Sequence, residues 1–151
     1  MDLRHGALET RDLVGAMSDV AQQMTSGTSL HAVVRTVGAV RALESSDEHH
    51  LLRIGLEALT NSIKHSGATR VEVLLRFDDD AVHLMVSDDG TGFVDAPLDR
   101  AGGHFGLRGI RERVDKIGGT LRLENQPEGG AMVAVRMPVA VRSELRPEMR
   151  V

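Results

Sequence analysis

The sequence predicts a two-layer α+β sandwich of the broad α/β class, with about three helices covering one face of a mixed β-sheet of about five strands. Two patterns indicate this class. Apolar residues recur every three to four positions, as on the buried side of a helix, in residues 10–25, 51–67 and 107–117. Alternating or β-branched residues, which are typical of strands, occupy residues 30–37, 71–77, 82–88, 120–124 and 131–137.

The composition bounds the possible classes of protein. With 151 residues and 41% hydrophobic content, the chain is long enough for one domain with a full core. No segment approaches the ~18 uncharged apolar residues of a membrane span, so we expect a soluble, cytoplasmic domain without direct membrane contact. The absence of Cys excludes disulfides and thiolate metal sites and fits a reducing compartment. A net charge of -4 and an aromatic content of only three Phe argue against nucleic-acid binding.

The first predicted helix can be capped by Thr10 or Asp12 and ends at the break formed by Ser26 and Gly27. Its apolar stripe consists of Leu13, Ala16, Met17, Val20 and Met24. Residues 30–37 are rich in β-branched side chains and follow as a strand. The chain therefore begins with a helix and a strand ahead of the central helix.

The central helix, residues 51–67, has two opposite faces. We expect one face to contact the core through Leu52, Leu56, Leu59 and Ile63. The other carries four different polar side chains on adjacent turns, Glu57, Asn61, Lys64 and His65. This polar face is either a functional site or the solvated side of an amphipathic helix, and the helix alone does not decide. Ser45 and Glu48 have capping-box spacing at its start, and Gly67 suits a left-handed residue at its end.

A β-hairpin follows the central helix. Residues 71–77 and 82–88 alternate apolar and polar side chains, and three aspartates, 78–80, form the turn between them. The alternation places Asp88 on the apolar face of its strand. An ionised carboxylate there needs N–H or O–H donors from protein, water or a ligand. The alternative is an aspartate just past the strand end that caps the turn from the surface.

Two glycine-rich segments flank a stretch without periodicity. They are Asp89-Gly90-Thr91-Gly92-Phe93 and Gly102-Gly103-His104-Phe105-Gly106, the second just ahead of helix 107–117. The residues between them, with Asp95, Pro97 and Asp99, indicate a mobile loop that could act as a lid. Free N–H groups at the start of the following helix would suit phosphate oxygens. A plain surface loop between glycines is the alternative.

The last predicted elements are strands 120–124 and 131–137, joined through Pro127-Glu128-Gly129-Gly130. Residues 139–151 hold too few apolar side chains to fold alone, so we expect a loose tail. The chain contains no P-loop, no dinucleotide fingerprint, no Gly-x-Ser-x-Gly elbow and no His-Glu-x-x-His zinc motif. These chemistries are therefore excluded.

Three motifs in order resemble those of the GHKL nucleotide-binding domains. They are Glu57-Ala58-Leu59-Thr60-Asn61-Ser62-Ile63-Lys64-His65, similar to the N-box, Asp88-Asp89-Gly90-Thr91-Gly92-Phe93, similar to the G1 box, and Gly103-His104-Phe105-Gly106-Leu107-Arg108-Gly109-Ile110-Arg111-Glu112-Arg113, similar to the G2 region. With Gly118-Gly119 and Gly129-Gly130 after it, the G2 region most resembles that of bacterial sensor histidine kinases of the NarL-like group. The resemblance implies their ATP-binding catalytic domain, with a Bergerat-type ATP-binding fold, over residues 9–138.

The resemblance implies a site for ATP and Mg²⁺ and assigns roles to its residues. Asn61 would give its carboxamide oxygen to Mg²⁺, which Glu57 would approach through a water molecule. Glu57 would also orient or deprotonate the attacking nucleophile, and Lys64 would neutralise phosphate charge. Asp88 would accept a hydrogen bond from the adenine amino group. His65 belongs to the motif, but its chemistry alone gives it no role.

The glycine-rich motifs would complete this nucleotide site. Gly90 and Gly92, with Phe93 beside them, would let the purine lie against backbone. Gly106 and Leu107 would form the hinge and N–H cradle of the lid, after Gly103, His104 and Phe105. Ala131 stands where many relatives have Thr, so a hydroxyl near the purine is lost and the affinity for ATP is in question. The purine pocket must be aliphatic, because the chain has no Trp or Tyr.

One part of such a kinase has no counterpart in the chain. In the family, the phosphoacceptor His lies in a helical hairpin ahead of this domain. None of His5, His31 or His49 lies in a similar segment, and residues 1–8 resemble the linker that follows the hairpin. We therefore expect a catalytic fragment of a longer, homodimeric sensor, membrane-anchored or not.

Three functions are compatible with the motifs. The first is protein-histidine kinase activity, with ATP, the histidine-containing dimerisation domain of the same kinase and a downstream response regulator as partners. The second is a GHKL ATPase or chaperone-like switch, which needs a following transducer domain that 151 residues do not accommodate. The third is a regulatory module of the same fold that binds nucleotide without phosphotransfer. Glu57, Asn61 and Asp88 are all present, which favours the first.

Overall fold

The computed structural model describes residues 2–65, 67–93 and 107–141, without the side chains of residues 2–12 and 65. Its elements, in chain order, are α1 (Asp2–Thr25), β1 (His31–Gly38), α2 (Ser45–His65), β2 (Arg70–Phe77), β3 (Ala81–Asp88), α3 (Leu107–Lys116), β4 (Thr120–Asn125) and β5 (Ala131–Pro138). The predicted lid, with Gly103, His104, Phe105 and Gly106, lies outside the described residues, as does the end of the predicted tail.

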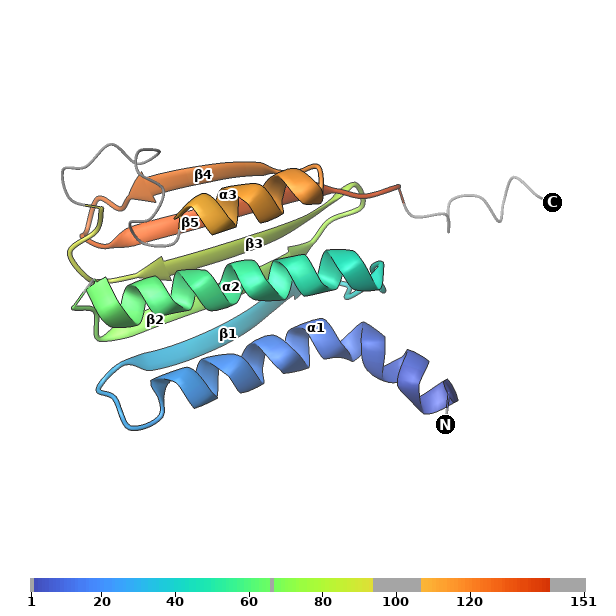
Figure 1. Cartoon of the computed structure of the whole chain (residues 1–151), viewed down its shortest axis with the longest axis horizontal. Coiled ribbons are helices and arrows are strands. Elements are labelled where there is room, and N and C mark those ends of the chain that lie inside the picture. The colour runs from blue at the N-terminus through green and yellow to red at the C-terminus, as the bar shows by residue number, and fades with distance from the viewer. Residues whose placement is uncertain (1, 66, 94–106, 142–151) are drawn as a thin grey trace.

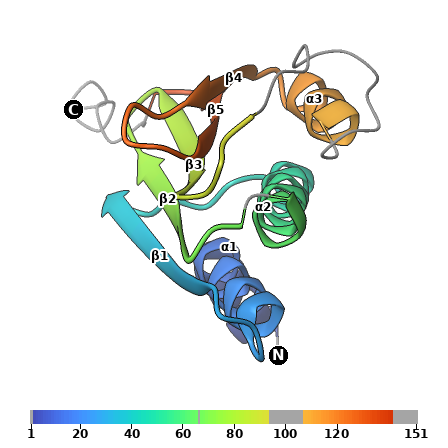
Figure 2. The same ribbon diagram turned by 90° about the vertical axis from the view of Figure 1, so that its left-hand side faces the viewer.

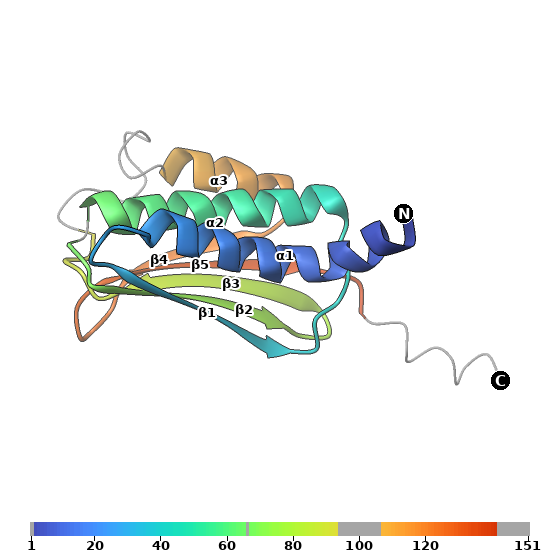
Figure 3. The same ribbon diagram turned by 90° about the horizontal axis from the view of Figure 1, so that it is seen from below.

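The five strands form one mixed sheet in the order β1-β2-β3-β5-β4. β1 pairs with β2 in parallel, and the other three pairings are antiparallel. Parallel neighbours need a crossover connection, and α2 supplies it between β1 and β2. Figure 1 shows the three helices side by side over the strands, and Figures 2 and 3 show that they share one face of the sheet. The predicted two-layer sandwich is confirmed.

The core lies between the helices and the inward-facing residues of the sheet. Alternate residues of β2 and β3 are buried, as their alternating pattern predicts. These residues are Val71, Val73, Leu75 and Phe77 on β2 and Val82, Leu84 and Val86 on β3. Asp88 takes the next inward position on β3, opposite Val71, and is also buried. The hairpin thus carries a carboxylate to the edge of the apolar layer.

The buried side of α2 differs from the predicted stripe. Its buried residues include Leu51, Ile54, Ala58, Leu59 and Ser62, beside Glu48 and Gly55. Of the predicted stripe only Leu59 belongs to this set, and Leu52, Leu56 and Ile63 are half-buried. The reason is that α2 lies between α1 and α3 and contacts both as well as the sheet. A helix with three neighbours has two adjacent apolar strips, and periodicity does not say which of them faces the sheet.

The start of α1 also differs from the prediction. The helix begins at Asp2, so neither Thr10 nor Asp12 is its first capping residue. Residues 2–11 contain no Pro and a single Gly, and most of them favour a helix, so the chain stays helical through both potential caps. The predicted end is confirmed at Thr25, whose hydroxyl donates to the carbonyl oxygen of Ala21 at 2.8 Å.

The corrected orientation of α2 gives a first prediction. Ile54→Ala is expected to lower the free energy of unfolding by about 2–5 kcal/mol, because it leaves a cavity where the side chain was fully buried. Leu52→Ala should lower it clearly less, since Leu52 is half-buried. Urea denaturation of the two variants beside the wild type measures both losses. A greater loss at Leu52 than at Ile54 would contradict the observed packing.

Candidate functional site

The carboxylate of Asp88 lies where β3 ends beneath α2, and it is only 6% exposed. Its Oδ2 accepts a hydrogen bond from the Ser62 hydroxyl at 2.7 Å. Its Oδ1 accepts from the backbone N–H groups of Gly90 at 2.9 Å and Ala131 at 3.2 Å. Three segments of the chain therefore supply the donors that a buried carboxylate needs. The alternative of an aspartate at the surface is excluded.

Ser62 is a site residue that the sequence analysis missed as a contact of Asp88. It is 4% exposed and lies on the buried side of α2. A hydroxyl at a core position of a helix needs a hydrogen-bond partner, and Asp88 needs donors. These two matching requirements were the available signal. The contact joins the C-terminal part of α2 to the end of β3.

Gly130 brings β5 against Asp88. A Cβ at this position would overlap the carbonyl oxygen of Asp88, and φ is +104°, so glycine alone fits without strain. This close approach presents the N–H of the next residue, Ala131, to the Asp88 carboxylate. Ala131 therefore contacts Asp88 through its backbone N–H, and this contact does not depend on its side chain.

The segment after Asp88 is held at two further points. Asp89 Oδ1 accepts from the N–H groups of Thr69 at 2.8 Å and Arg70 at 3.0 Å, and Oδ2 accepts from the Thr69 hydroxyl at 2.8 Å. Asn125, at the end of β4, donates to the Phe93 carbonyl at 3.0 Å and accepts from the Phe93 N–H at 2.7 Å. No sequence motif marks Asn125, because its partner lies in a distant segment.

The contacts of Asp89 give a prediction about pH. The N–H of Arg70 first, then the Thr69 hydroxyl and N–H, lower the pKa of Asp89 below its ordinary value of 3.8. A depressed pKa means that Asp89 stabilises the fold above pH 3.8, and that this stabilisation is lost as the pH falls through the lower, folded-state value. Urea denaturation of Asp89→Asn should show less loss of stability across this acidic window than the wild type. Asp79→Asn, in the exposed β2–β3 turn, is the control. Identical pH profiles for Asp89→Asn and wild type would contradict the assignment.

The polar face of α2 includes Asn61, which is next to Ser62 in the chain, and Glu57, one turn earlier. Asn61 Nδ2 and Glu57 Oε1 are both shielded from solvent and have no hydrogen-bond partner. A buried polar atom without a hydrogen-bond partner destabilises the folded state and is uncommon. Such an atom often bonds to water or a ligand. Two of the three predicted catalytic residues, Glu57 and Asn61, therefore carry unused hydrogen-bonding capacity in the same stretch of helix that contacts Asp88.

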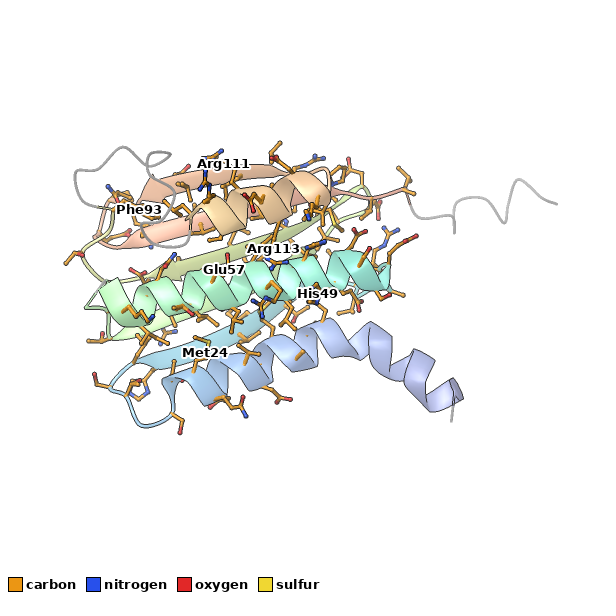
Figure 4. The ribbon with its side chains drawn as sticks, in the orientation of Figure 1. Met24, His49, Glu57, Phe93, Arg111 and Arg113 are labelled. Carbon is orange, nitrogen blue, oxygen red and sulfur yellow. The ribbon has the colours of Figure 1, made fainter. Side chains whose placement is uncertain are left out.

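Glu57 lies against α3. A Cβ on Gly109 would lie 2.9 Å from Glu57 Oε1, so the missing side chain of Gly109 makes room for the carboxylate. Arg113 Nε lies 3.9 Å from Glu57 Oε2. Burial raises the pKa of Glu57, and the charges of Arg113 and Arg53 act in the opposite direction. Figure 4 shows Glu57 and Arg113 at the contact of the two helices.

The structure places the described residues that the sequence predicted for the site in separate groups. Asp88 accepts hydrogen bonds from Gly90 and Ala131, and Phe93 pairs with Asn125 beside Gly92. Glu57 and Asn61 lie on α2, with Glu57 against Gly109 of α3, and Leu107 begins α3. Gly92 has φ +83 and lies close to Gly130 and Asn125. The side chain of Leu107 is buried. Lys64 is exposed at the end of α2, and the His65 side chain lies outside the described atoms.

The opposite face of the sheet has a separate hollow of about 320 Å³. It is lined by Arg76, His83, Met85, Thr120, Leu121, Arg122, Ala134, Val135 and Arg136. The three arginines each lie within 4.0 Å of a carboxylate, of Asp78, Glu124 and Asp80 respectively. The hollow therefore presents no excess of cations, and none of the predicted site residues lines it.

The described part of the chain has neither a cluster of metal-binding side chains nor a membrane-spanning helix. In residues 2–65, 67–93 and 107–141, no group of three or more His, Cys, Asp or Glu side chains could hold a metal ion. Over the same ranges, no helix combines the length and apolar character needed to cross a membrane.

Comparison with known proteins names the family of this domain. The profile of the histidine kinase-, DNA gyrase B- and HSP90-like ATPases matches residues 46–141. The chain belongs to this family, and the predicted GHKL membership is confirmed.

Individual relatives agree with this assignment. The chain is 39% identical over 93 residues to the sensor protein VraS of Staphylococcus aureus, which is 61% of this chain and 26% of VraS. It thus spans about a quarter of the length of the curated relatives that it matches. The ATP binding domain of PrrB from Mycobacterium tuberculosis superposes with a TM-score of 0.67 at 24% identity, over 84% of this chain and 91% of that one. The histidine kinase domain of the Erythrobacter litoralis EL346 blue-light activated kinase gives 0.68 at 20% identity, over 85% and 60%. These two likenesses show the shared fold.

Proposed function

We propose that the chain is the catalytic ATP-binding domain of a two-component sensor histidine kinase. It binds Mg-ATP and transfers the γ-phosphoryl group to a histidine of a separate dimerisation domain, from which a response regulator receives it. The main support is one structural feature: a buried carboxylate, Asp88, adjoins a helix face on which Asn61 and Glu57 hold polar atoms without partners. Family membership and the sensor protein relatives support the same function.

Asp88 would recognise the purine. Each carboxylate oxygen has two lone pairs, so Oδ2 can accept from Ser62 and from the adenine amino group at once. The contacts from Gly90 and Ala131 hold Oδ1 and so fix the direction of Oδ2. An acceptor fixed in this way favours adenine, which has an exocyclic donor, over guanine, which has a carbonyl oxygen at the corresponding position.

Asn61 would hold Mg²⁺. The amide of Asn61 has one buried atom without a partner, and a half-turn of the amide exchanges its oxygen and nitrogen, so its oxygen can face a ligand. Mg²⁺ prefers oxygen ligands and takes few of them from the protein, so a single carboxamide beside phosphate oxygens suits it. When bound, Mg²⁺ neutralises charge on the β- and γ-phosphates. Glu57 would meet the metal through water.

Glu57 would act on the incoming histidine. The imidazole nitrogen attacks the γ-phosphorus, an N–P bond forms, and the bond from phosphorus to the β-phosphate oxygen breaks to release ADP. The Glu57 carboxylate orients the imidazole or takes the proton that it loses. Lys64, exposed at the end of α2, would lie toward the phosphates and offset their charge.

Phosphoryl transfer to a supplied acceptor tests this function. The full chain is mixed with the histidine-containing dimerisation domain of its parent kinase and ATP labelled at the γ-phosphate. The proposal expects label on the dimerisation domain that depends on Mg²⁺ and is lost when the acceptor His is replaced by Gln. Binding of Mg-ATP without any transfer would instead support a regulatory module that only binds nucleotide.

A further inference from the structure

A cluster at the contact of α2 and α3 includes two residues that the proposed function does not use, His50 and Arg113. His50 and Glu57 both lie on α2, seven residues apart, which is about two turns along one face. Arg113, on α3, is close to both: its Nη1 is 3.2 Å from His50 Nδ1, and its Nε is 3.9 Å from Glu57 Oε2. Figure 4 shows Arg113 on the side of α3 that faces α2. One guanidinium therefore spans two turns of the neighbouring helix.

The chemistry of these groups fixes which atom donates. An arginine can only donate hydrogen bonds, so His50 Nδ1 must be the acceptor and must carry no proton. Burial, followed by the positive charge of Arg113, lowers the pKa of His50, which favours the neutral ring that this contact requires. The neutral His50 ring therefore accepts a hydrogen bond from the Arg113 guanidinium and restricts its orientation.

The Glu57 carboxylate is limited from two sides by α3. Its Oε1 fills the space left by the missing side chain of Gly109, and its Oε2 faces Arg113. About a quarter of each side chain is exposed, 26% for Glu57 and 25% for Arg113, so the pair is screened by water only in part. The position of this carboxylate is thus set by how α3 packs on α2.

We propose that Arg113 is a positioning residue for phosphoryl transfer, which holds the Glu57 carboxylate in its working place while His50 holds Arg113. The inference rests on the proposed role of Glu57. Arg113 acts through Glu57 and makes no contact with nucleotide, so it should affect the rate of transfer and leave the affinity for ATP unchanged. Through this contact, the reactivity of Glu57 also depends on how α3 packs against α2.

The first test separates rate from affinity. Arg113→Met keeps most of the apolar length of the side chain and removes its charge, whereas Arg113→Lys keeps a cation. Arg111→Met is the matched control, because Arg111 lies on the same helix and is exposed. At saturating Mg-ATP, transfer by Arg113→Met should be slower by about 10- to 100-fold, the scale of a misplaced catalytic group. Arg113→Lys should recover part of this rate, and Arg111→Met should keep all of it. The affinities for Mg-ATP measured by calorimetry should be the same for the wild type and these three variants.

Chemical rescue gives a readout that a merely structural role would not move. Free guanidinium ion, added at concentrations that do not unfold the protein, should restore part of the rate of Arg113→Ala and leave the wild type unchanged. A wild-type rate in Arg113→Met would overturn the proposal. A fall in Mg-ATP affinity with an unchanged rate would also overturn it, because Arg113 would then contact the nucleotide.

A double-mutant cycle decides the contact without any phosphotransfer. Urea denaturation of wild type, Glu57→Gln, Arg113→Met and the double variant yields the coupling between the two side chains. We expect a coupling of about threefold or more in the unfolding equilibrium constant, as for residues in contact. Additive effects would overturn the inference even if the kinase function is correct. If the coupling is clear but the wild type transfers no phosphoryl group, the contact between Glu57 and Arg113 is correct and the proposed kinase function is wrong.

Discussion

Glu57→Gln is expected to slow phosphoryl transfer at saturating Mg-ATP by about 10²–10⁴-fold, the usual contribution of a positioned acid–base group. Gln has nearly the shape of Glu, so it can keep the packing against Gly109 while it loses the negative charge that faces the incoming histidine. The affinity for Mg-ATP should change little, because Glu57 is expected to approach the metal only through water. Single-turnover transfer to the dimerisation domain, with calorimetry in parallel, measures both quantities.

Stability gives a check that this variant is folded. Burial raises the pKa of Glu57, so its contribution to stability falls as the pH rises through that raised value, and a neutral Gln escapes this loss. Glu57→Gln should therefore be at least as stable as the wild type at neutral pH. Glu44→Gln, whose side chain is exposed just before α2, serves as the matched control and should transfer at the wild-type rate. Wild-type transfer by Glu57→Gln would exclude Glu57 as the catalytic carboxylate.

Asp88→Asn is expected to weaken the binding of Mg-ATP by about 1–3 kcal/mol, which corresponds to a Kd raised roughly 5- to 150-fold. The carboxamide oxygen can still accept from Gly90 and Ala131, and its NH₂ group can donate to the Ser62 hydroxyl. The same NH₂ group then faces the adenine amino group, so a donor meets a donor. The variant should fold normally and lose affinity, which calorimetry and urea denaturation together establish.

Ser62→Ala is the control for this change. It removes the hydroxyl that donates to Oδ2 and leaves the carboxylate in place, so its effect on affinity should be smaller than that of Asp88→Asn. An unchanged affinity for Mg-ATP in Asp88→Asn would remove Asp88 from the purine site, whatever the result at Ser62.

Local patterns predicted the parts of the fold that depend on near neighbours in sequence. Strict alternation placed Asp88 on the buried face of β3, since the period of a strand leaves only two choices. The stripe of α2 was right only in part: Leu59 is buried in the core and Leu52 and Ile63 pack against it, but a helix with neighbours on several sides has more than one apolar strip. The start of α1 was wrong because a potential cap such as Thr10 permits a helix start without forcing one.

The site shows the same division. Glu57, Asn61 and Asp88 could be selected from motifs of a few residues. No motif marks the contacts between distant segments, which include Ser62 with Asp88, 26 residues apart, and Asn125 with Phe93, 32 residues apart. Arg113 lay within a recognised motif, yet its role beside His50, 63 residues away, follows only from the packing of α3 on α2.

Isothermal titration of the chain with Mg-ATP and, separately, with Mg-GTP tests the central claim most directly, namely that Asp88 and the polar face of α2 border one adenine nucleotide site. We expect one site per chain for Mg-ATP and an affinity for Mg-GTP that is lower by about tenfold or more, the effect of one lost and partly buried hydrogen bond. Equal affinities for the two nucleotides, or no binding of Mg-ATP at millimolar concentration, would contradict it.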